Sequence, residues 1–167
     1  MDTFPPSLTL RSVKPDDLPH LEAVRQAAFA PVFASFRAIL GEEIYQLAQA
    51  RDDEAHDQVL ISLLAPDSGW DVYVAEQVGV VVGFVSVKLN LETHVGEIGL
   101  NAVHPHYAGQ GIGTAMYDFI LARMKEAGMQ VATVATGGDP SHAPARRAYE
   151  KAGFTVQIPG VWLYRRL

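Results

Sequence analysis

The sequence predicts one mixed α/β domain in which helices flank a sheet, and three observations lead to this expectation. At 167 residues the chain has the length of one domain, 1–167, which can bury about two-thirds of its unfolded surface. Residues 70–90 hold two β-branched runs on either side of a tight-turn signal, which predicts a β-hairpin. Residues 112–127 then switch to helical spacing, so strands and helices share the domain.

The first half of the chain has the pattern of one strand followed by several helices. Residues 7–13 alternate between polar and apolar side chains, as a strand does. Residues 15–17 offer helix-start signals, and we expect the helix that follows to end near Pro31, because proline interrupts helix hydrogen bonding. Residues 32–64 keep helical spacing with a break at Gly41, which predicts two or three short helices.

In the second half, strands and helices alternate. The turn of the hairpin is expected at 77–79, where a glycine stands between the two β-branched runs. Beyond it we expect a strand over 95–103, a helix over 112–127 closed by Gly128, a strand over 129–134, a helix from an N-cap at Ser141 to Ala152, and a last strand from Phe154 onward. All strands are expected to join one sheet.

The composition excludes several classes of function. The formal net charge is −6, and no basic stripe is present that could bind the phosphates of a nucleic acid. The absence of cysteine excludes disulfides, thiolate metal sites and a cysteine nucleophile, and the six histidines show no familiar metal-ligand spacing, so we expect no metal. No signal peptide is recognisable and the apolar runs are too short to span a bilayer, so we expect a cytoplasmic protein that does not bind membranes.

Three glycines at alternate positions, Gly109, Gly111 and Gly113, stand directly before the helix expected from Ile112. The first amides of a helix have no internal acceptor, and the helix dipole adds partial positive charge there. Without Cβ atoms in the way, a phosphate can approach these amides closely. A glycine turn packed on a strand is the structural alternative, but it would need only one glycine. The spacing matches neither a dinucleotide fingerprint nor a P-loop, so it favours another anion, with a pyrophosphate as the best candidate.

Three segments of the sequence resemble one known family. The stretch VHPHYAGQGIGTAM resembles motif A of the GNAT superfamily of acyl-CoA-dependent N-acyltransferases, and the two motif glycines fall on Gly111 and Gly113. YVAEQVGVVVGFVSV is similar to the central hairpin of the family, and ARRAYEKAGF resembles its motif B; together they cover most of residues 70–155. The resemblance implies a central, mostly antiparallel sheet flanked by helices, and acetyl-CoA as the co-substrate without a metal.

The same resemblance implies which residues bind the coenzyme. Ala108 stands where the family generally carries arginine or glutamine, which removes one side-chain contact to the coenzyme. His142 stands where the family often places an asparagine that contacts the pantetheine arm. The residues expected to bind the coenzyme are Ala102, Val103, Ala108, Gly109, Gln110, Gly111, Ile112, Gly113, Thr114 and His142.

Transfer of an acetyl group from a thioester to an amine needs a group that accepts the amine proton and a group that protonates the departing thiolate. Glu97 is the candidate base, directly or through a water that Glu97 or His94 polarises, because some family members carry a catalytic glutamate at the corresponding place. Tyr149 in motif B is the candidate acid. A backbone N–H near Val103 is implied as the oxyanion donor, since the strand of the family splays or bulges there.

The acceptor is the part of the reaction that the sequence determines least. Phe33 and Phe36 are candidates for lining its pocket, and the alternative is that both are core residues. Either a small molecule or a peptide can supply the primary amine, the length of the acyl chain is open, and the protein is expected to be a monomer or a homodimer. The alternative function is a non-catalytic acyl-CoA sensor or partner-binding module on the same fold, against which Glu97 and Tyr149 together argue.

Overall fold

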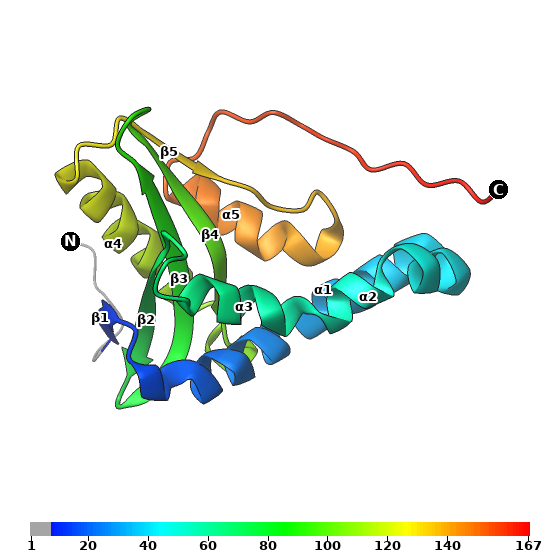
Figure 1. Cartoon of the computed structure of the whole chain (residues 1–167), viewed down its shortest axis with the longest axis horizontal. Helices are drawn as coiled ribbons and strands as arrows, with labels where there is room; N and C mark the ends of the chain where they lie inside the picture. The colour runs from blue at the N-terminus through cyan, green and yellow to red at the C-terminus, as the bar shows by residue number, and fades with distance from the viewer. Residues whose placement is uncertain (1–7) are drawn as a thin grey trace.

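The computed structural model describes residues 8–167, in which one five-stranded sheet lies between two layers of helices (Figure 1). The strands, which stand in the sheet in chain order, are β1 (Leu8–Ser12), β2 (Asp71–Gln77), β3 (Val80–Asn90), β4 (Val95–Val103) and β5 (Val131–Val134). Neighbouring strands are antiparallel except β4 and β5, which are parallel. The expected mixed, mostly antiparallel sheet is confirmed. The strand expected over 7–13 is β1, and Ser7 lies outside the described residues.

Helices cover both faces of this sheet. They are α1 (Leu18–Ala48), α2 (Ala50–Glu54), α3 (His56–Leu64), α4 (Ile112–Glu126) and α5 (Ala143–Lys151), with 3₁₀ turns η1 (Pro15–Asp17), η2 (Pro105–Tyr107) and η3 (Pro140–His142). On one face, Leu21 of α1 and Leu60 of α3 pack in one cluster with Val74 and Phe84 of the sheet, and all four side chains are fully buried. Burial of each such side chain stabilises the fold by roughly 1.5–3 kcal/mol.

The opposite face of the sheet is covered by α4 and α5. Ile112, Met116 and Ile120 recur on one side of α4 and pack in one cluster with Val85 and Ile98 of the sheet. The helical spacing expected from Ile112 onward is therefore confirmed, and it holds the start of α4 against β4. Because β4 and β5 are parallel, the chain must cross over between them, and α4 makes this crossover.

The first helix is longer than the sequence predicts. It continues through Pro31 to Ala48 instead of ending near Pro31, and its backbone leaves the helical conformation only at Gly41 (φ 73°, ψ 156°), where a break was expected. Pro31 removes one backbone donor, but Val24 before it and Val32 after it are both buried. Tertiary packing on both sides therefore outweighs the proline signal. With α2, the end of α1 forms an arm that projects beyond the sheet (Figure 1).

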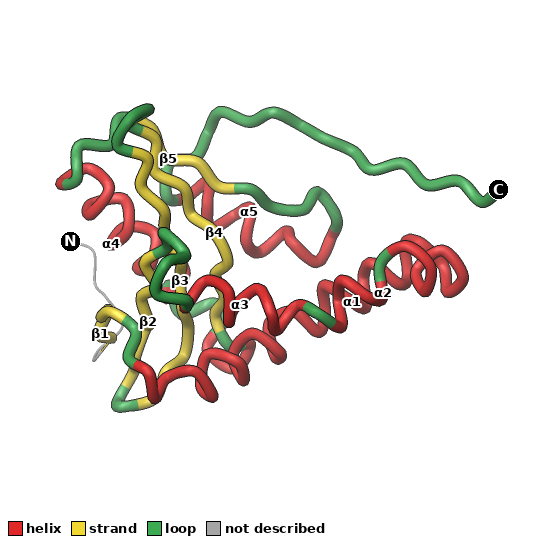
Figure 2. Tube along the Cα trace, viewed as in Figure 1, coloured by secondary structure: helices red, strands yellow, loops and turns green. Residues whose placement is uncertain are grey.

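The last strand that the sequence predicts is absent from the structure. Phe154 is anchored, because its N–H donates to the Tyr149 carbonyl at 3.0 Å and its ring lies 6.0 Å from the Tyr149 ring. Residues 155–167, called the C-terminal tail below, form neither helix nor strand and are exposed throughout (Figure 2). A strand forms only against a neighbouring strand, and in this chain the tail lies against none.

Candidate functional site

The sheet opens between β4 and β5. The two strands pair from Val95 opposite Val131 to Ile98 opposite Val134, where β5 ends, whereas β4 continues to Val103. On this side of β4 residues 99–103 are therefore released from the ladder with β5, and the backbone groups there that no side chain of the chain bonds can bind a ligand. The site residues that the sequence predicts come mainly from β4, the start of α4 and α5, which border this gap (Figure 1).

A β-bulge lies in the released part of β4. Two residues, Gly99 and Leu100, stand opposite Ser86 alone, and Ser86 Oγ donates to the Leu100 carbonyl at 3.0 Å. Only glycine fits at position 99, because a Cβ there would come within 2.5 Å of the Trp70 ring. The irregularity that was expected near Val103 thus lies earlier in the strand, where the strands separate.

The glycine turn has the geometry of a helix start that is open to a ligand. Gly109 (φ 76°) and Gly111 (φ 79°) adopt the left-handed conformation that favours glycine, and Gly111 is the N-cap of α4. The Ala115 N–H donates to the Gly111 carbonyl at 2.9 Å, and the amides before it have no acceptor within the helix. No side chain among residues 8–167 caps this end of α4.

This turn fits a diphosphate. A Cβ at Gly109 or Gly111 would meet no atom within 4 Å, so no other part of the described chain packs against the side-chain positions of these two glycines. Helix-start amides and the helix dipole favour an anion there. The side chains of Ala102 and Ile112 are 7% and 1% exposed in the core, so these two predicted residues can offer only their backbone. The other predicted contacts of this turn are Ala108 and Gln110, which are exposed, and Val103, Gly113 and Thr114, which are half-buried.

Tyr149 takes part in a hydrogen-bond network on β4. Asn101 Nδ2 donates to the Tyr149 hydroxyl at 3.0 Å and to the Gly99 carbonyl at 2.9 Å, while Asn101 Oδ1 accepts from the Tyr117 hydroxyl at 2.8 Å. The contact of the Tyr149 hydroxyl with Oδ1 is longer, 3.4 Å. The Tyr149 oxygen thus accepts from Asn101 Nδ2, while its own proton makes only the long hydrogen bond to Asn101 Oδ1, which a closer acceptor can replace. Asn101 belongs to the released part of β4, so the network borders the gap.

Tyr117 connects this network to the glycine turn. Its ring centroid lies 4.8 Å from that of Tyr149, and its Cε2 lies 3.9 Å from the position of a Cβ at Gly113. Burial raises the pKa of Tyr117 well above its usual value, so its hydroxyl remains a donor to Asn101. The sequence analysis missed both Asn101 and Tyr117. The available signal was an asparagine within an apolar strand, because a polar side chain that is even half-buried needs partners.

His142 is held by the loop that precedes α5. The Asp139 carboxylate accepts from the Ser141 N–H at 3.1 Å and from Ser35 Oγ of α1 at 2.8 Å, and it contacts His142 Nδ1. The cap at Ser141 that the sequence predicts is wrong: Asp139 caps the turn η3, through which the chain enters α5, and the N-cap residue of α5 itself is His142. Burial alone would raise the pKa of Asp139, but the hydrogen bonds from Ser141, Ser35 and His142 outweigh it and lower that pKa below its ordinary 3.8.

Of the two aromatic residues expected near the acceptor, Phe36 lies beside this loop. Its ring stacks on His142 with the centroids 6.0 Å apart. Phe33 instead packs edge-on against His56 of α3, at 5.4 Å between centroids. Phe33 thus belongs to the packing between α1 and α3, whereas Phe36 and His142 face one another where α1 meets the loop before α5.

Glu97 lies on the opposite face of the sheet from Tyr149. Ile98 and Tyr149 belong to the same cluster, under α4 and α5. Because side chains alternate along a strand, Glu97 points to the face that α1 and α3 cover. It is exposed, and its neighbours in the sheet are Lys88 of β3 and Thr133 of β5. The two candidate catalytic residues therefore approach the end of the β4–β5 pairing from different faces.

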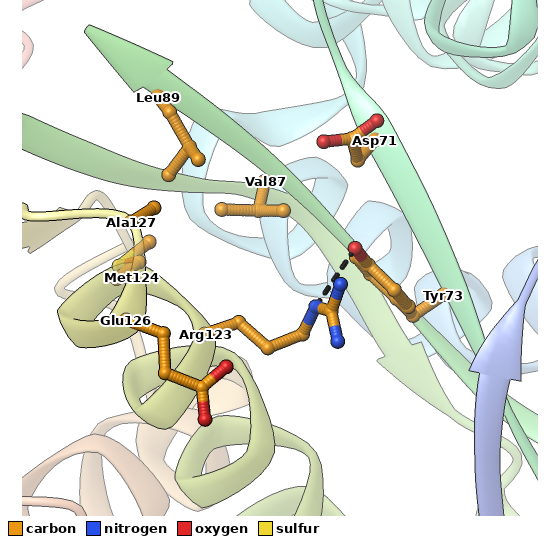
Figure 3. A pocket seen from close by; sticks show the side chains of 8 residues that line it. All are labelled: Asp71, Tyr73, Val87, Leu89, Arg123, Met124, Glu126 and Ala127. Carbon is orange, nitrogen blue, oxygen red and sulfur yellow. Dashed lines mark hydrogen bonds between the residues drawn. The ribbon is translucent and has the colours of Figure 1, made fainter. Parts of the chain in front are cut away.

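A pocket of about 280 Å³ lies elsewhere, at the C-terminal end of α4 (Figure 3). There Arg123 donates to the Tyr73 hydroxyl at 3.0 Å, and none of the predicted site residues lines the pocket. In the described chain, residues 8–167, we find no group of three His, Asp or Glu side chains that could hold a metal ion. None of its helices combines the length and the hydrophobicity needed to cross a bilayer.

Comparison with known sequences identifies relatives of this chain. Residues 34–154 match the acetyltransferase (GNAT) family. Mycothiol acetyltransferase of Propionibacterium freudenreichii subsp. shermanii is 29% identical over 155 residues, which are 92% of this chain and 45% of that protein. The chain thus spans about half the length of this curated relative.

Solved structures share the fold of the chain. An aminoglycoside acetyltransferase from an uncultured soil metagenomic sample, in complex with sisomicin, superposes with a TM-score of 0.60 at 18% identity and covers 96% of both chains. A GNAT family acetyltransferase from Brucella melitensis, in complex with acetyl-CoA, gives a TM-score of 0.56 at 21% identity over 89% of this chain and 83% of that chain. At such identities the likeness concerns the fold. The family match, however, extends over more than half of the sequence and includes the glycine turn and Tyr149, so this chain belongs to the GNAT acetyltransferase family.

Proposed function

We propose that this protein is an acetyl-CoA-dependent N-acetyltransferase that moves the acetyl group directly to a primary amine. The observation that carries the proposal is the connection between the open glycine turn and Tyr149, through Tyr117 and Asn101. An anion site alone would suit many functions. An anion site joined to a hydroxyl whose proton is only weakly bonded, at a gap in the sheet, suits transfer from the thioester of a phosphorylated carrier.

The coenzyme would bind along the gap between β4 and β5. The amides around Gly111 and Gly113 would hold its diphosphate, with Gln110 and Thr114 beside them, and His142 would contact the pantetheine arm. The released backbone of residues 99–103 offers hydrogen bonds to the extended arm and, at a residue such as Val103, a donor to the carbonyl oxygen. Acetyl-CoA supplies the acetyl group as a thioester.

Tyr149 is the proposed acid. In the transfer, the amine nitrogen bonds to the acetyl carbon and the carbon–sulfur bond breaks, so the sulfur needs a proton. The Tyr149 hydroxyl can donate it, because Asn101 Nδ2 already donates to the Tyr149 oxygen and the hydroxyl proton makes only a long hydrogen bond of 3.4 Å to Asn101 Oδ1. The hydrogen bond from Asn101 Nδ2 stabilises the phenolate that remains, which solvent then reprotonates.

Glu97 is the proposed base, acting directly or through a water that Glu97 or His94 polarises. A lysine-like amine has a pKa of about 10.4 and must lose a proton before it attacks. Glu97 is exposed on the face that α1 and α3 cover, so an amine can approach from that side while the coenzyme lies along the gap. Glu97, directly or through the water, would take the proton that the ammonium loses before attack and pass it to solvent, and would then take the second proton from the nitrogen once the carbon–nitrogen bond has formed. Because the proton that Tyr149 gives to the thiolate is replaced from solvent, the reaction releases one net proton and balances.

The proposed acceptor is a small molecule with a positively charged primary amine. The net charge of −6 favours the approach of a cation. The rings of Phe36 and His142 offer a flat surface beside the gap. A structural neighbour is an aminoglycoside acetyltransferase in complex with sisomicin, and we extend that class of acceptor to this chain as a proposal. A peptide amine is the other acceptor to test.

Release of free thiol from acetyl-CoA tests the proposed function. The protein is incubated with acetyl-CoA and a panel of aminoglycosides, polyamines, amino acids and peptides with free N-termini, and thiol is measured together with the mass of the acetylated product. We expect at least one cationic amine to give thiol and an N-acetyl product in equal amounts. Binding of acetyl-CoA without thiol release for any amine would contradict an enzymatic role and favour a coenzyme sensor.

A further inference from the structure

Arg123, near the C-terminal end of α4, is an arginine that aromatic neighbours hold in place. Its Nε donates to the Tyr73 hydroxyl at 3.0 Å. Its guanidinium carbon lies 5.1 Å from the centre of the Tyr73 ring and 5.5 Å from that of the Phe119 ring, and Tyr73 itself is buried. One hydrogen bond and two cation–π contacts therefore fix the direction of this side chain.

The two Nη groups of Arg123 have no partner within the part of the chain that the structure describes. No ion pair joins the guanidinium to a carboxylate there, and its one hydrogen bond uses Nε. A guanidinium presents its N–H groups as a planar fork that matches the two oxygens of a carboxylate. Because the side chain is held and its fork is unoccupied, Arg123 is suited to bind a carboxylate from outside the chain.

Arg123 lines the pocket of about 280 Å³ at the end of α4 (Figure 3). Val87, Leu89 and Met124 line the same pocket; Val87 and Met124 are buried and Leu89 is half-buried. Pockets for drug-sized ligands have volumes of roughly 300–1,000 Å³, so this pocket suits a smaller molecule. It places an apolar wall beside the unoccupied guanidinium.

Two carboxylates give the pocket a second charge preference. Asp71 and Glu126 line it and are exposed, and in Figure 3 they stand on opposite sides of the Arg123 side chain. The C-terminal end of α4 adds partial negative charge. A ligand with only a negative charge would face these carboxylates, and a ligand with only a positive charge would face Arg123. A ligand that carries an ammonium beside its carboxylate suits both.

We propose that this pocket binds a free α-amino acid with an apolar side chain. The carboxylate of the amino acid accepts from the Nη groups of Arg123, its ammonium lies toward Asp71 and Glu126, and its side chain packs on the apolar wall. The pocket is separate from the proposed coenzyme site, because Arg123 and Gly111 are about 20 Å apart along the axis of α4. The inference therefore does not depend on the proposed function.

A chemical-shift titration of the ¹⁵N-labelled protein, without acetyl-CoA, tests this site. The probe is L-leucine, and three compounds each lack one of its features: 4-methylpentanoate the ammonium, 3-methylbutylamine the carboxylate and glycine the apolar body. We expect leucine to shift the signals of residues 123–127 and to bind at least about tenfold more tightly than each of the three. No saturable shift with leucine, or a compound of the three that binds as tightly, overturns the proposal.

Three variants then locate the binding. Arg123→Gln removes the charge but can still donate to the Tyr73 hydroxyl, and Ala127→Phe fills the pocket without a change of charge. Both should weaken leucine binding by about tenfold or more. Lys125→Gln is the matched control, because it removes one positive charge from the same end of α4 outside the pocket, and it should bind leucine like the wild type.

Far-UV circular dichroism shows which variants are folded, and only folded variants are compared. If Arg123→Gln or Ala127→Phe does not fold, the other of the two decides, and the series of compounds on the wild type decides by itself. Unchanged leucine affinity in a folded Arg123→Gln or Ala127→Phe protein overturns the proposal. An equal loss of affinity in Lys125→Gln would also overturn it, because the effect would then come from net charge.

Discussion

Whether the Tyr149 hydroxyl can donate its proton to a ligand depends on the hydrogen bonds that its neighbours make with it. Asn101 has two amide hydrogens and uses one for the Gly99 carbonyl and one for the Tyr149 oxygen, while its own oxygen accepts from Tyr117. The Tyr149 proton makes only a long hydrogen bond, 3.4 Å to the same oxygen, so it is the most weakly held proton of the network and can turn to a group in the gap. The proposed protonation of the departing thiolate depends on this one proton.

Replacement of Tyr149 should therefore separate chemistry from binding. Tyr149→Phe keeps the ring that packs beside Tyr117 and Phe154 but removes the proton. We expect kcat to fall by about 10²- to 10⁴-fold, with the Kd for acetyl-CoA changed little. Tyr164→Phe, in the exposed tail, is the control and should keep wild-type kcat. If both variants turn over at the wild-type rate, Tyr149 is not the acid.

A second prediction about a single residue concerns Glu97. Glu97→Gln is close to isosteric but cannot accept the amine proton, so we expect kcat/KM for the amine to fall by about 10²-fold or more while acetyl-CoA still binds. Glu92→Gln, in the turn after β3, controls for the loss of one negative charge. Equal, small effects of the two substitutions on steady-state kinetics would mean that Glu97 acts only through its charge.

Candidate site residues could be predicted from the sequence only where they belong to a pattern of neighbouring residues in the chain. Gly111 and Tyr149 stand in recognisable local patterns, a glycine turn before a helix and a motif B helix. Asn101 and Tyr117 could not be assigned in the same way, because their contact joins β4 to α4 across the fold. The face on which Glu97 lies also required the structure, since alternation alone gives two equal choices.

Among the elements, the start of α4 carries the proposed coenzyme site, and its glycines can be tested against a matched turn. Gly111→Ala places a Cβ at φ 79°, which should cost about 1–2 kcal/mol of unfolding free energy. Gly79→Ala in the β2–β3 hairpin carries the same strain at φ 77°, also with no atom within 4 Å of the new Cβ. We expect similar losses of stability, but weaker acetyl-CoA binding in calorimetry for Gly111→Ala alone. Equal affinities would place the coenzyme elsewhere.

Two elements show why local signals can fail. The helix signal at Pro31 was wrong, because packing before and after the proline keeps α1 continuous. The strand expected from Phe154 has the side chains of a strand but no partner in its own sheet, and a strand depends on its partner as much as on its sequence. The hairpin, β4, α4 and α5 were predicted correctly because they bury a regular apolar stripe.

At the scale of the whole molecule, buried or partly buried carboxylates connect distant segments and make stability depend on pH. Hydrogen bonding to Arg11 lowers the pKa of Asp17, and hydrogen bonding to Arg25 lowers that of Glu22. Asp139 joins α1 to the loop before α5 through Ser35, and its pKa is lowered as well. A lowered carboxyl pKa contributes stability that is present above the unfolded value and is lost as the pH falls through the folded value.

The melting temperature should therefore change little between about pH 7 and pH 5 and fall steeply below about pH 4. Asp139→Asn should melt lower than wild type at neutral pH, and the gap should narrow as acid protonates Asp139 in the wild type. Calorimetric scans of both proteins across this range measure the effect. A gap that stays constant down to about pH 2 would show that the Asp139 charge does not stabilise the fold.

In the proposed reaction, the opening between β4 and β5 would let the coenzyme and the amine approach from different faces of one sheet. The proposed coenzyme site and acid lie with α4 and α5, and the proposed base lies on the side of α1 and α3. A crystal structure with coenzyme A bound tests this arrangement most directly. The account predicts the diphosphate within hydrogen-bond distance of the amides around Gly111 and Gly113, and the sulfur beside the Tyr149 hydroxyl. A coenzyme that binds away from the glycine turn, or a sulfur remote from Tyr149, would contradict it.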